Sequence, residues 1–521
     1  SVKIVARLGS PDDDFIHHNI TVAQFGLHRG WGRDAMTQAE EIRKNIDLAD
    51  RQDFSGFPFV TIDAATTRDM DDAIYVKQEN GSWQLWVAIA DPGHFVAPGT
   101  PIAKSARDFG QSVYLPGKSL SMLPENLAND AFSLLPDMPR SVLAVRIDVA
   151  GDGEITDYEF MFGKMISRAK LAYQDVGAML RGGDIKISDD DAINSSLREA
   201  SLLARARLAY RQKNHLVYDE QPDYDLVINK KGALEGVHKR ERNDAHRLVE
   251  EAMLCANICA GNFLAQHKTG VFTTHLGFRP ERLGEVRAVL REDLGEEFNS
   301  EKINELSGHV EFIHFLQNSE SHRPLLAPLK RMMQNSEVNT EADPHLSMGV
   351  SHYATITSPI RRYVDLCNHW SIMQILHGKQ AQQMPAKILE QLRETLQQGR
   401  QASRQLEQIL VGQYLADKIG LEGQGVIRIV TQQGFGVKLL DTGFEGFVQI
   451  PKKVEKTFDA KRMTLQIGDK RFALDDVVNV RVSGVDLGKR RVQMALSDGF
   501  PTVTENESGE ADSAEEILVQ E

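Results

Sequence analysis

The segment FVTIDAATTRDMDDAIYV, residues 59–76, constrains the fold more than any other part of this sequence. The apolar runs FVTI and AIYV predict two buried strands, with the acidic residues lying between them. Carboxylates this close together repel one another, so a fold that gathers them needs a compensating cation. Such oxygen ligands suit Mg²⁺ or, as an alternative, Mn²⁺. The candidate metal ligands are Asp63, Asp69, Asp71 and Asp72.

An acidic turn that faces solvent is the alternative interpretation, and the spacing alone does not exclude it. The apolar runs on both sides favour the metal site. In an extended chain Asp69 and Asp71 share one side, and Asp72 points the other way unless the loop twists. The segment lacks the turn glycine and the closing glutamate of an EF-hand loop.

A second motif, SPIRRY, offers the positive charge that a metal site acting on phosphate needs. The preceding Thr and Ser and the following Pro predict a helix over residues 359–377 that Gly378 ends. Arg361 and Arg362 would lie in its first turn, where free N–H groups favour an anion. We expect Asp365 to hold Arg361, although an ordinary exposed ion pair is the alternative.

Periodicity divides the chain into a mixed body and a β-rich C-terminal part. Strand patterns run to about residue 91, with Asn80-Gly81 as a hairpin turn. After Gly423, five short β runs predict a small closed barrel. The tail from Pro501 is acidic and is predicted to be disordered. Helical spacing marks 195–214, 242–268 and 387–418.

Composition restricts the setting more than the function. The net charge of −14 is uneven, because residues 501–521 carry seven acidic and no basic side chains. Residues 421–500 hold 13 Lys and Arg against 10 Asp and Glu, so local attraction for phosphate remains. Three cysteines argue against a disulfide framework and predict a reducing, cytoplasmic location. No run of 18 apolar residues or signal peptide is recognisable, so we expect no membrane partner.

Five separated motifs together resemble the catalytic domain of the ribonuclease II/R family, also called RNB-type. They keep the family's order across about residues 55–415. The resemblance implies an α+β fold, in which a large mixed sheet-and-helix catalytic domain encloses an RNA channel and precedes a five-stranded OB-type (S1) β-barrel. The motifs are FVTIDAATTRDMDDAIYV, WVAIADPGHFV, SVYLPGKSLSMLP, LVEEAMLCAN and HYATITSPIRRYVDLCNH, and GFGVKLLDTGFEGFVQI resembles the S1 barrel.

The resemblance also implies domain boundaries. We expect an N-terminal segment at 1–50, a catalytic domain at 51–418, an S1-type barrel at 419–500 and an acidic tail at 501–521. Family members usually carry two cold-shock domains before the catalytic domain. Because the first 25 residues resemble the tail of such a domain, we expect a remnant there. Phe132 stands where the family commonly has Cys.

The family activity implied is processive 3′→5′ hydrolysis of single-stranded RNA to nucleoside 5′-monophosphates, in RNA decay, with Mg²⁺ held by the four aspartates. Asp71 matches the aspartate most critical for cleavage, Asp69 completes the site, and Arg361 matches the arginine at the scissile phosphate. The matches to positions that contact RNA are Tyr114, Tyr173, Tyr218 and Glu250.

Other candidate contacts come from the residues themselves. Arg362 shares the helix start predicted to bind phosphate, and Phe435 and Phe447 interleave with basic residues of the barrel. We predict that both phenylalanines stack on bases, with burial in the barrel core as the alternative.

Three other functions stay open: an inactive RNA-binding protein on this scaffold, a DNA-directed metal nuclease, and a scaffold in an RNA-decay assembly. We expect a monomer whose acidic tail contacts a protein partner.

Overall fold

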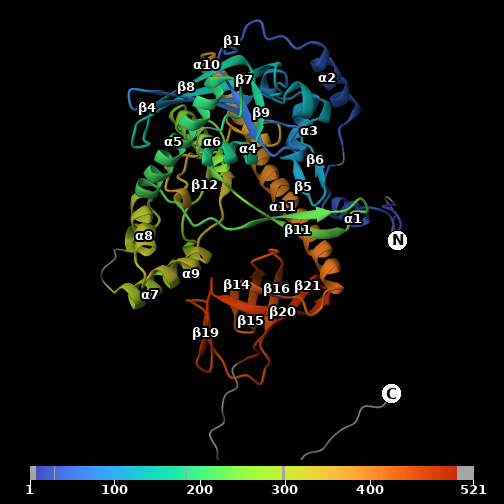
Figure 1. Cartoon of the computed structure of the whole chain (residues 1–521), viewed down its shortest axis with the longest axis vertical. Coiled ribbons are helices and arrows are strands. Elements are labelled where there is room, and N and C mark those ends of the chain that lie inside the picture. Colours follow the sequence, from blue (N-terminus) through green and yellow to red (C-terminus); the bar gives the residue numbers. More distant parts are fainter. Residues whose placement is uncertain (1–6, 29, 183–184, 296–299, 501–521) are drawn as a thin grey trace, which may run out of the picture.

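The computed structural model describes residues 7–28, 30–182, 185–295 and 300–500. Figure 1 shows a mixed α/β body at the top and a β-barrel at the bottom, joined by the long helix α11 (Ala386–Ala416). The predicted tail at 501–521 lies outside the described residues.

A seven-stranded sheet forms the centre of the body. Asn80 and Gly81 have positive φ angles of 52° and 80° and close a two-residue hairpin between β3 and β4, as predicted. Neighbouring strands pair antiparallel except at the two edges, where β1 and β9 run parallel to their partners. The order is β1 (Gln52–Asp53), β8 (Ile155–Ile166), β7 (Pro139–Val149), β4 (Ser82–Ala90), β3 (Asp72–Glu79), β2 (Val60–Asp63) and β9 (Ala169–Ala172).

Helices cover both faces of the sheet, so its central strands are buried on each side. In β4, Leu85, Val87 and Ile89 face one core while Trp86 and Ala88 face the other. Burying each large aliphatic side chain stabilises the fold by about 1.5–3 kcal/mol. One face carries α2 (Arg33–Lys44), α3 (Pro101–Phe109) and α10 (Tyr363–Leu376), and the other carries α4 (Tyr173–Arg181), α5 (Asp191–Asn214) and α6 (Asp244–Gln266).

Helix α6 forms much of the second core. Cys255 and Cys259 lie buried on it as free thiols, which agrees with core packing. Within the described residues α6 is also the one helix that is long and apolar enough to cross a membrane by length and composition alone. Because 61% of that stretch is buried inside the fold, it serves here as a core helix.

Smaller elements surround the body. A separate core joins α7 (Leu283–Leu294), α8 (Leu306–Asn318) and α9 (Leu326–Arg331). Helix α1 (Ile16–Gln24) packs against α11. Three two-stranded ribbons complete the body: β5 (Val113–Leu115) with β6 (Lys118–Leu120), β10 (Asp223–Ile228) with β11 (Leu234–Arg240), and β12 (Phe272–Thr274) with β13 (Glu337–Asn339).

The five predicted C-terminal strands close into a barrel. Its core continues into α11 through Leu406, Leu410 and Leu415, so body and barrel share apolar packing. The barrel strands are β14 (Glu422–Thr431), β15 (Gly434–Leu439), β16 (Glu445–Gln449), β20 (Val477–Asp486) and β21 (Arg491–Leu496); β17 (Thr457–Asp459), β18 (Thr464–Ile467) and β19 (Lys470–Phe472) form a side sheet.

The prediction for Phe435 was wrong. Its ring is fully buried in the barrel and stacks on Phe472 with centroids 4.9 Å apart, so it has no face for a base. It lies on the inward side of β15, and the buried alternative applies. Phe447 on β16 is only partly buried and keeps exposed surface.

Candidate active site

The register of three strands brings the aspartate segment to one edge of the sheet. Asp63 ends β2 and pairs with Ala172 of β9, and Asp72 begins β3. The connection between β2 and β3 is fixed by Ser133, whose hydroxyl accepts the Met70 N–H at 3.0 Å and donates to the Arg68 carbonyl at 2.7 Å. The loop therefore folds back, and both strand ends meet at one place.

Asp71 joins the aspartate segment to the SPIRRY segment. Its carboxylate is 5% exposed, and Oδ1 accepts the Ile360 N–H at 3.0 Å. Oδ2 lies 3.3 Å from Nε of Arg361. The Asp71 carbonyl accepts the Ala90 N–H at 2.7 Å, which anchors the main chain to β4. The arginine and the aspartate are thus held together although 290 positions separate them in the sequence.

The carboxylates perturb one another, as expected for a gathered cluster. Burial raises the pKa of Asp71 to about 7, opposed by Arg361 and reinforced by Asp69. Burial also raises the pKa of Asp63 to about 6, with Lys170 opposing. Burial, Asp63 and Asp71 raise the pKa of Asp72 well above its usual range. The loop therefore twists enough for Asp72 to interact with its neighbours.

The donor set fits a hard divalent cation, although it is not drawn together as a complete cage. Among the described residues, no three His, Cys, Asp or Glu side chains are arranged closely enough to hold an ion. Mg²⁺ usually takes only one or two carboxylates and fills its octahedron with water and substrate phosphate. The oxygen chemistry suits such an open site, and the electrostatic coupling of Asp72 to Asp63 and Asp71 indicates that these carboxylates lie close to one another.

The predicted helix start at Pro359 was wrong. Helix α10 begins at Tyr363, so Arg361 and Arg362 lie before it, in a turn and an extended residue. Asp365 also pairs with Arg362 at 2.9 Å and not with Arg361. The reason is tertiary: the Tyr363 N–H donates to the Gly110 carbonyl at 2.9 Å, and the Arg361 carbonyl accepts the Ser112 N–H at 2.9 Å, so neither group is free for a helical bond.

Two predicted tyrosines lie beside the aspartates. Tyr114 on β5 is 53% exposed, and burial of its hydroxyl end together with Asp69 raises its pKa to about 12. Tyr173 begins α4, and burial, Asp72 and Asp63 raise its pKa. Its ring stacks on His246 with centroids 4.0 Å apart. Tyr114 therefore lies on the side of Asp69, and Tyr173 lies on the side of Asp72.

The other two predicted contacts in the body lie elsewhere. The ring of Tyr218 is covered by Lys330, whose Nζ is 3.4 Å from the centroid, and burial alone raises the Tyr218 pKa to about 12. Within the described residues no aspartate of the cluster contributes to this pKa, so Tyr218 lies apart from the site that Tyr114 flanks. Glu250 is exposed on α6 and forms an ion pair with Arg242. Tyr218 and Glu250 line a cavity of about 300 Å³.

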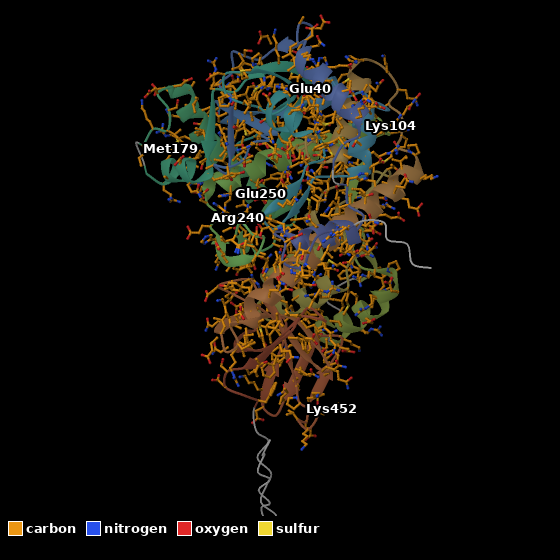
Figure 2. The ribbon with its side chains drawn as sticks, turned by 90° about the vertical axis from the view of Figure 1, so that its right-hand side faces the viewer. Glu40, Lys104, Met179, Arg240, Glu250 and Lys452 are labelled. Atoms are coloured by element: carbon orange, nitrogen blue, oxygen red, sulfur yellow. The ribbon has the colours of Figure 1, made fainter. Side chains whose placement is uncertain are left out.

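Several basic side chains around the aspartate cluster were not predicted from the sequence. Lys170 on β9 donates to the Ala65 carbonyl at 3.1 Å and the Thr67 carbonyl at 2.5 Å, which fixes the aspartate loop. Arg240 and Arg242 act electrostatically on Tyr173. Figure 2 shows Arg240 and Glu250 together in the body, while Lys452 lies at the far end of the barrel. The signal available was the basic run KRER, directly before the capped start of α6.

The raised pKa values predict how metal and pH affect stability. Because Asp63 and Asp71 hold protons more tightly folded than unfolded, their contribution is fully present below about pH 4 and is lost as pH rises through about 6 to 7. We therefore expect Mg²⁺ to raise the melting temperature more at pH 8 than at pH 5.5, because protons compete for the same oxygens.

Replacement of one carboxylate separates this effect from general salt stabilisation. Asp72→Asn is expected to melt higher than the parent chain in EDTA at pH 8 and to lose most of the Mg²⁺-dependent rise. The exposed Asp189→Asn is the matched control and should respond like the parent. Calorimetry with EDTA or Mg²⁺ measures both, and an undiminished Mg²⁺ response in Asp72→Asn would refute the ligand assignment.

Comparison with known proteins gives consistent matches. The family model described as RNB domain matches residues 51–378. Exoribonuclease 2 of Yersinia pseudotuberculosis serotype IB (strain PB1/+) is 32% identical over 499 residues, which cover 94% of this chain and 76% of that protein. The apo form of Mycoplasma genitalium RNase R superposes with a TM-score of 0.81 and 25% identity, over 94% of this chain and 79% of that one. The same RNase R in complex with ribose-methylated single-stranded RNA gives a TM-score of 0.81 and 24% identity over the same shares.

Proposed function

The chain belongs to the RNB domain family, and on that premise we propose that it is a 3′→5′ exoribonuclease that hydrolyses single-stranded RNA processively to nucleoside 5′-monophosphates. The observation that carries this proposal is the buried Asp71 carboxylate, which fixes Arg361 beside three further aspartates. Relatives named Exoribonuclease 2 match most of the chain, and a related RNase R binds single-stranded RNA. The proposed setting is RNA decay in the cytoplasm, by a monomer.

The proposed cofactor is Mg²⁺, with Mn²⁺ as a substitute. Asp63 and Asp72 would hold it, and Asp69 would complete the site. When bound, Mg²⁺ activates water and stabilises charge on the phosphate. Burial raises the pKa values of Asp63 and Asp72, and neighbouring carboxylates add to this, so a cation held between these oxygens would relieve their repulsion.

The protein's own contribution centres on Arg361. Asp71 orients this guanidinium through Nε, and the side chain remains 41% exposed. Its terminal nitrogens form no hydrogen bond within the described residues, so they can donate to a phosphate. A fixed donor aimed at developing negative charge stabilises a transition state without reorganisation. Burial of Asp71 places its carboxylate in a less polar environment than water, which strengthens its attraction to the guanidinium.

Tyr114 and Tyr173 are the proposed base contacts. Base stacking on an aromatic ring contributes about 1–3 kcal/mol per base and tolerates any sequence. Tyr173 keeps a fixed orientation through its stack on His246, so it offers the other face of its ring. A site flanked by two rings suits one strand and disfavours a duplex.

For the C-terminal barrel we propose an S1-type, OB-fold role in RNA capture. Closed five-stranded barrels of this kind commonly bind single strands. Phe447, which keeps exposed surface on β16, is the proposed stacking residue. The proposed boundary at 418/419 falls just after the last helical turn of α11. The proposed acidic partner segment at 501–521 lies outside the described residues.

Digestion of 5′-labelled single-stranded RNA tests the proposal directly. We expect labelled fragments that shorten from the 3′ end, with nucleoside 5′-monophosphates as released product. EDTA should stop the reaction and Mg²⁺ should restore it. Matching DNA should be degraded far more slowly. If RNA stays intact in Mg²⁺, the proposal is wrong and the chain is better explained as an inactive RNA-binding protein. If DNA is digested as fast as RNA, the chain is better explained as a metal nuclease without preference for RNA.

A further inference from the structure

The segment that presents Arg361 has no helix or strand of its own. Residues 353–362, here called the arginine loop, follow an irregular path between α6 and α10. Much of the loop is buried, and its polar main-chain atoms must therefore find partners. Side chains of the two helices provide them.

Three residues of α10 hold one side of the arginine loop. Asp365 accepts the Thr355 hydroxyl at 2.6 Å and the Ser358 N–H at 2.8 Å. Asn368 donates to the Thr355 carbonyl at 2.9 Å, and His369 Nε2 contacts the Ile356 carbonyl at 2.8 Å. All three α10 side chains are completely buried.

One residue of α6 holds the opposite side. Asn257, 4% exposed, accepts the Ile356 N–H through Oδ1 at 2.9 Å. Its Nδ2 donates to the Tyr353 hydroxyl at 3.1 Å and to the Thr357 hydroxyl at 3.4 Å. All three of these side-chain bonds go to the arginine loop. Among the described residues, this carboxamide has no other partner.

We propose that Asn257 is a positioning residue for Arg361. The last residue that it bonds is Thr357. Three and four positions later, the Ile360 N–H and the Arg361 guanidinium contact the Asp71 carboxylate. Loss of the carboxamide would remove the side-chain bonds between α6 and the arginine loop, leaving the main-chain bond from the Ala354 N–H to the Asn257 carbonyl at 3.3 Å. The guanidinium could then drift from the place that Asp71 defines. The inference rests on the proposed ribonuclease function.

Helix α6 also carries a residue that contacts one of the proposed base contacts. Its first turn carries His246, which stacks on Tyr173 beside the aspartates. The same rigid helix therefore fixes a proposed base contact at one end and the arginine loop at Asn257. Displacement of a catalytic group by about 1 Å can cost about 100-fold in rate.

A double-mutant cycle tests the proposal, with kcat and KM measured on single-stranded RNA in Mg²⁺. We expect Asn257→Ala to lower kcat about 10- to 100-fold and to leave KM within about twofold. In an Arg361→Ala background the same change should cost less than about threefold, because the group it positions is gone. General destabilisation would lower activity equally in both backgrounds.

Two further variants keep the test decisive. Asn262→Ala, on the same helix, removes only a bond to His352 at 3.1 Å and should keep kcat within about twofold. Asn257→Asp, which retains an acceptor for the Ile356 N–H, should lose less than Asn257→Ala and serves if the latter does not fold. Equal losses in both Arg361 backgrounds, or an unchanged kcat in a folded Asn257 variant, would overturn the proposal. If the parent chain itself is inactive, the proposed function fails instead.

Discussion

Asp71→Asn is expected to lower kcat about 10³-fold while the affinity for single-stranded RNA stays within a few-fold of the parent chain. The amide has the shape of the carboxylate, and its oxygen can still accept the Ile360 N–H. Its NH₂ group would then face Nε of Arg361, so an attraction becomes a contact between two donors. The fold loses little, because a buried carboxylate with a pKa raised to about 7 is itself costly to ionise.

Single-turnover digestion and binding of fluorescent RNA measure the two effects of Asp71→Asn separately. The exposed Asp189→Asn should match the parent in both assays. Turnover within tenfold of the parent, in a variant that binds RNA normally, would remove Asp71 from the chemistry. Loss of RNA binding with unchanged melting would instead make it a substrate contact.

Arg361→Ala is the second change with a large expected effect, about 10²- to 10³-fold in kcat. The guanidinium is the one cation that Asp71 fixes within 4 Å in the described structure. Arg361→Lys should recover little of this loss, because a single ammonium nitrogen cannot present two parallel donors to a phosphate while it also bonds Asp71.

Arg362→Ala provides the matched contrast to Arg361→Ala. Arg362 is tied to Asp365 and the Thr357 hydroxyl, so its loss should lower the melting temperature and reduce kcat less. Kinetics and thermal melts of both variants check this division. A larger kcat loss in Arg362→Ala, with normal stability, would return the phosphate contact to Arg362 and contradict the assignment.

Patterns that depend on neighbouring residues were predicted well. The strands around the aspartates, the Asn80-Gly81 hairpin and the barrel strands all follow from alternation and turn residues. These signals act over a few residues, and the tertiary structure agrees with them. The division into a mixed body and a C-terminal barrel follows from the same signals, whereas the α+β class was implied by the family resemblance.

Features set by distant residues could not be predicted in this way. The capping residues before Pro359 indicated a helix start, yet the Tyr363 N–H donates to the distant Gly110 carbonyl and the helix begins only at Tyr363. Alternation in β15 did not tell which side of the barrel Phe435 would occupy. Lys330, which lies over the Tyr218 ring, is more than 100 positions away from it in the sequence. Each outcome depends on a contact that no local window contains.

If the barrel binds the same RNA that the body degrades, helix α11 acts as a rigid connection between the two. Its 31 residues extend about 46 Å without a break. Ser403 at its middle holds the main chain of Tyr114, and Leu410 and Leu415 beyond it are built into the barrel core. Tension on the RNA would thus be transmitted along α11. The distance between the barrel and the aspartate site would stay constant while the RNA moves.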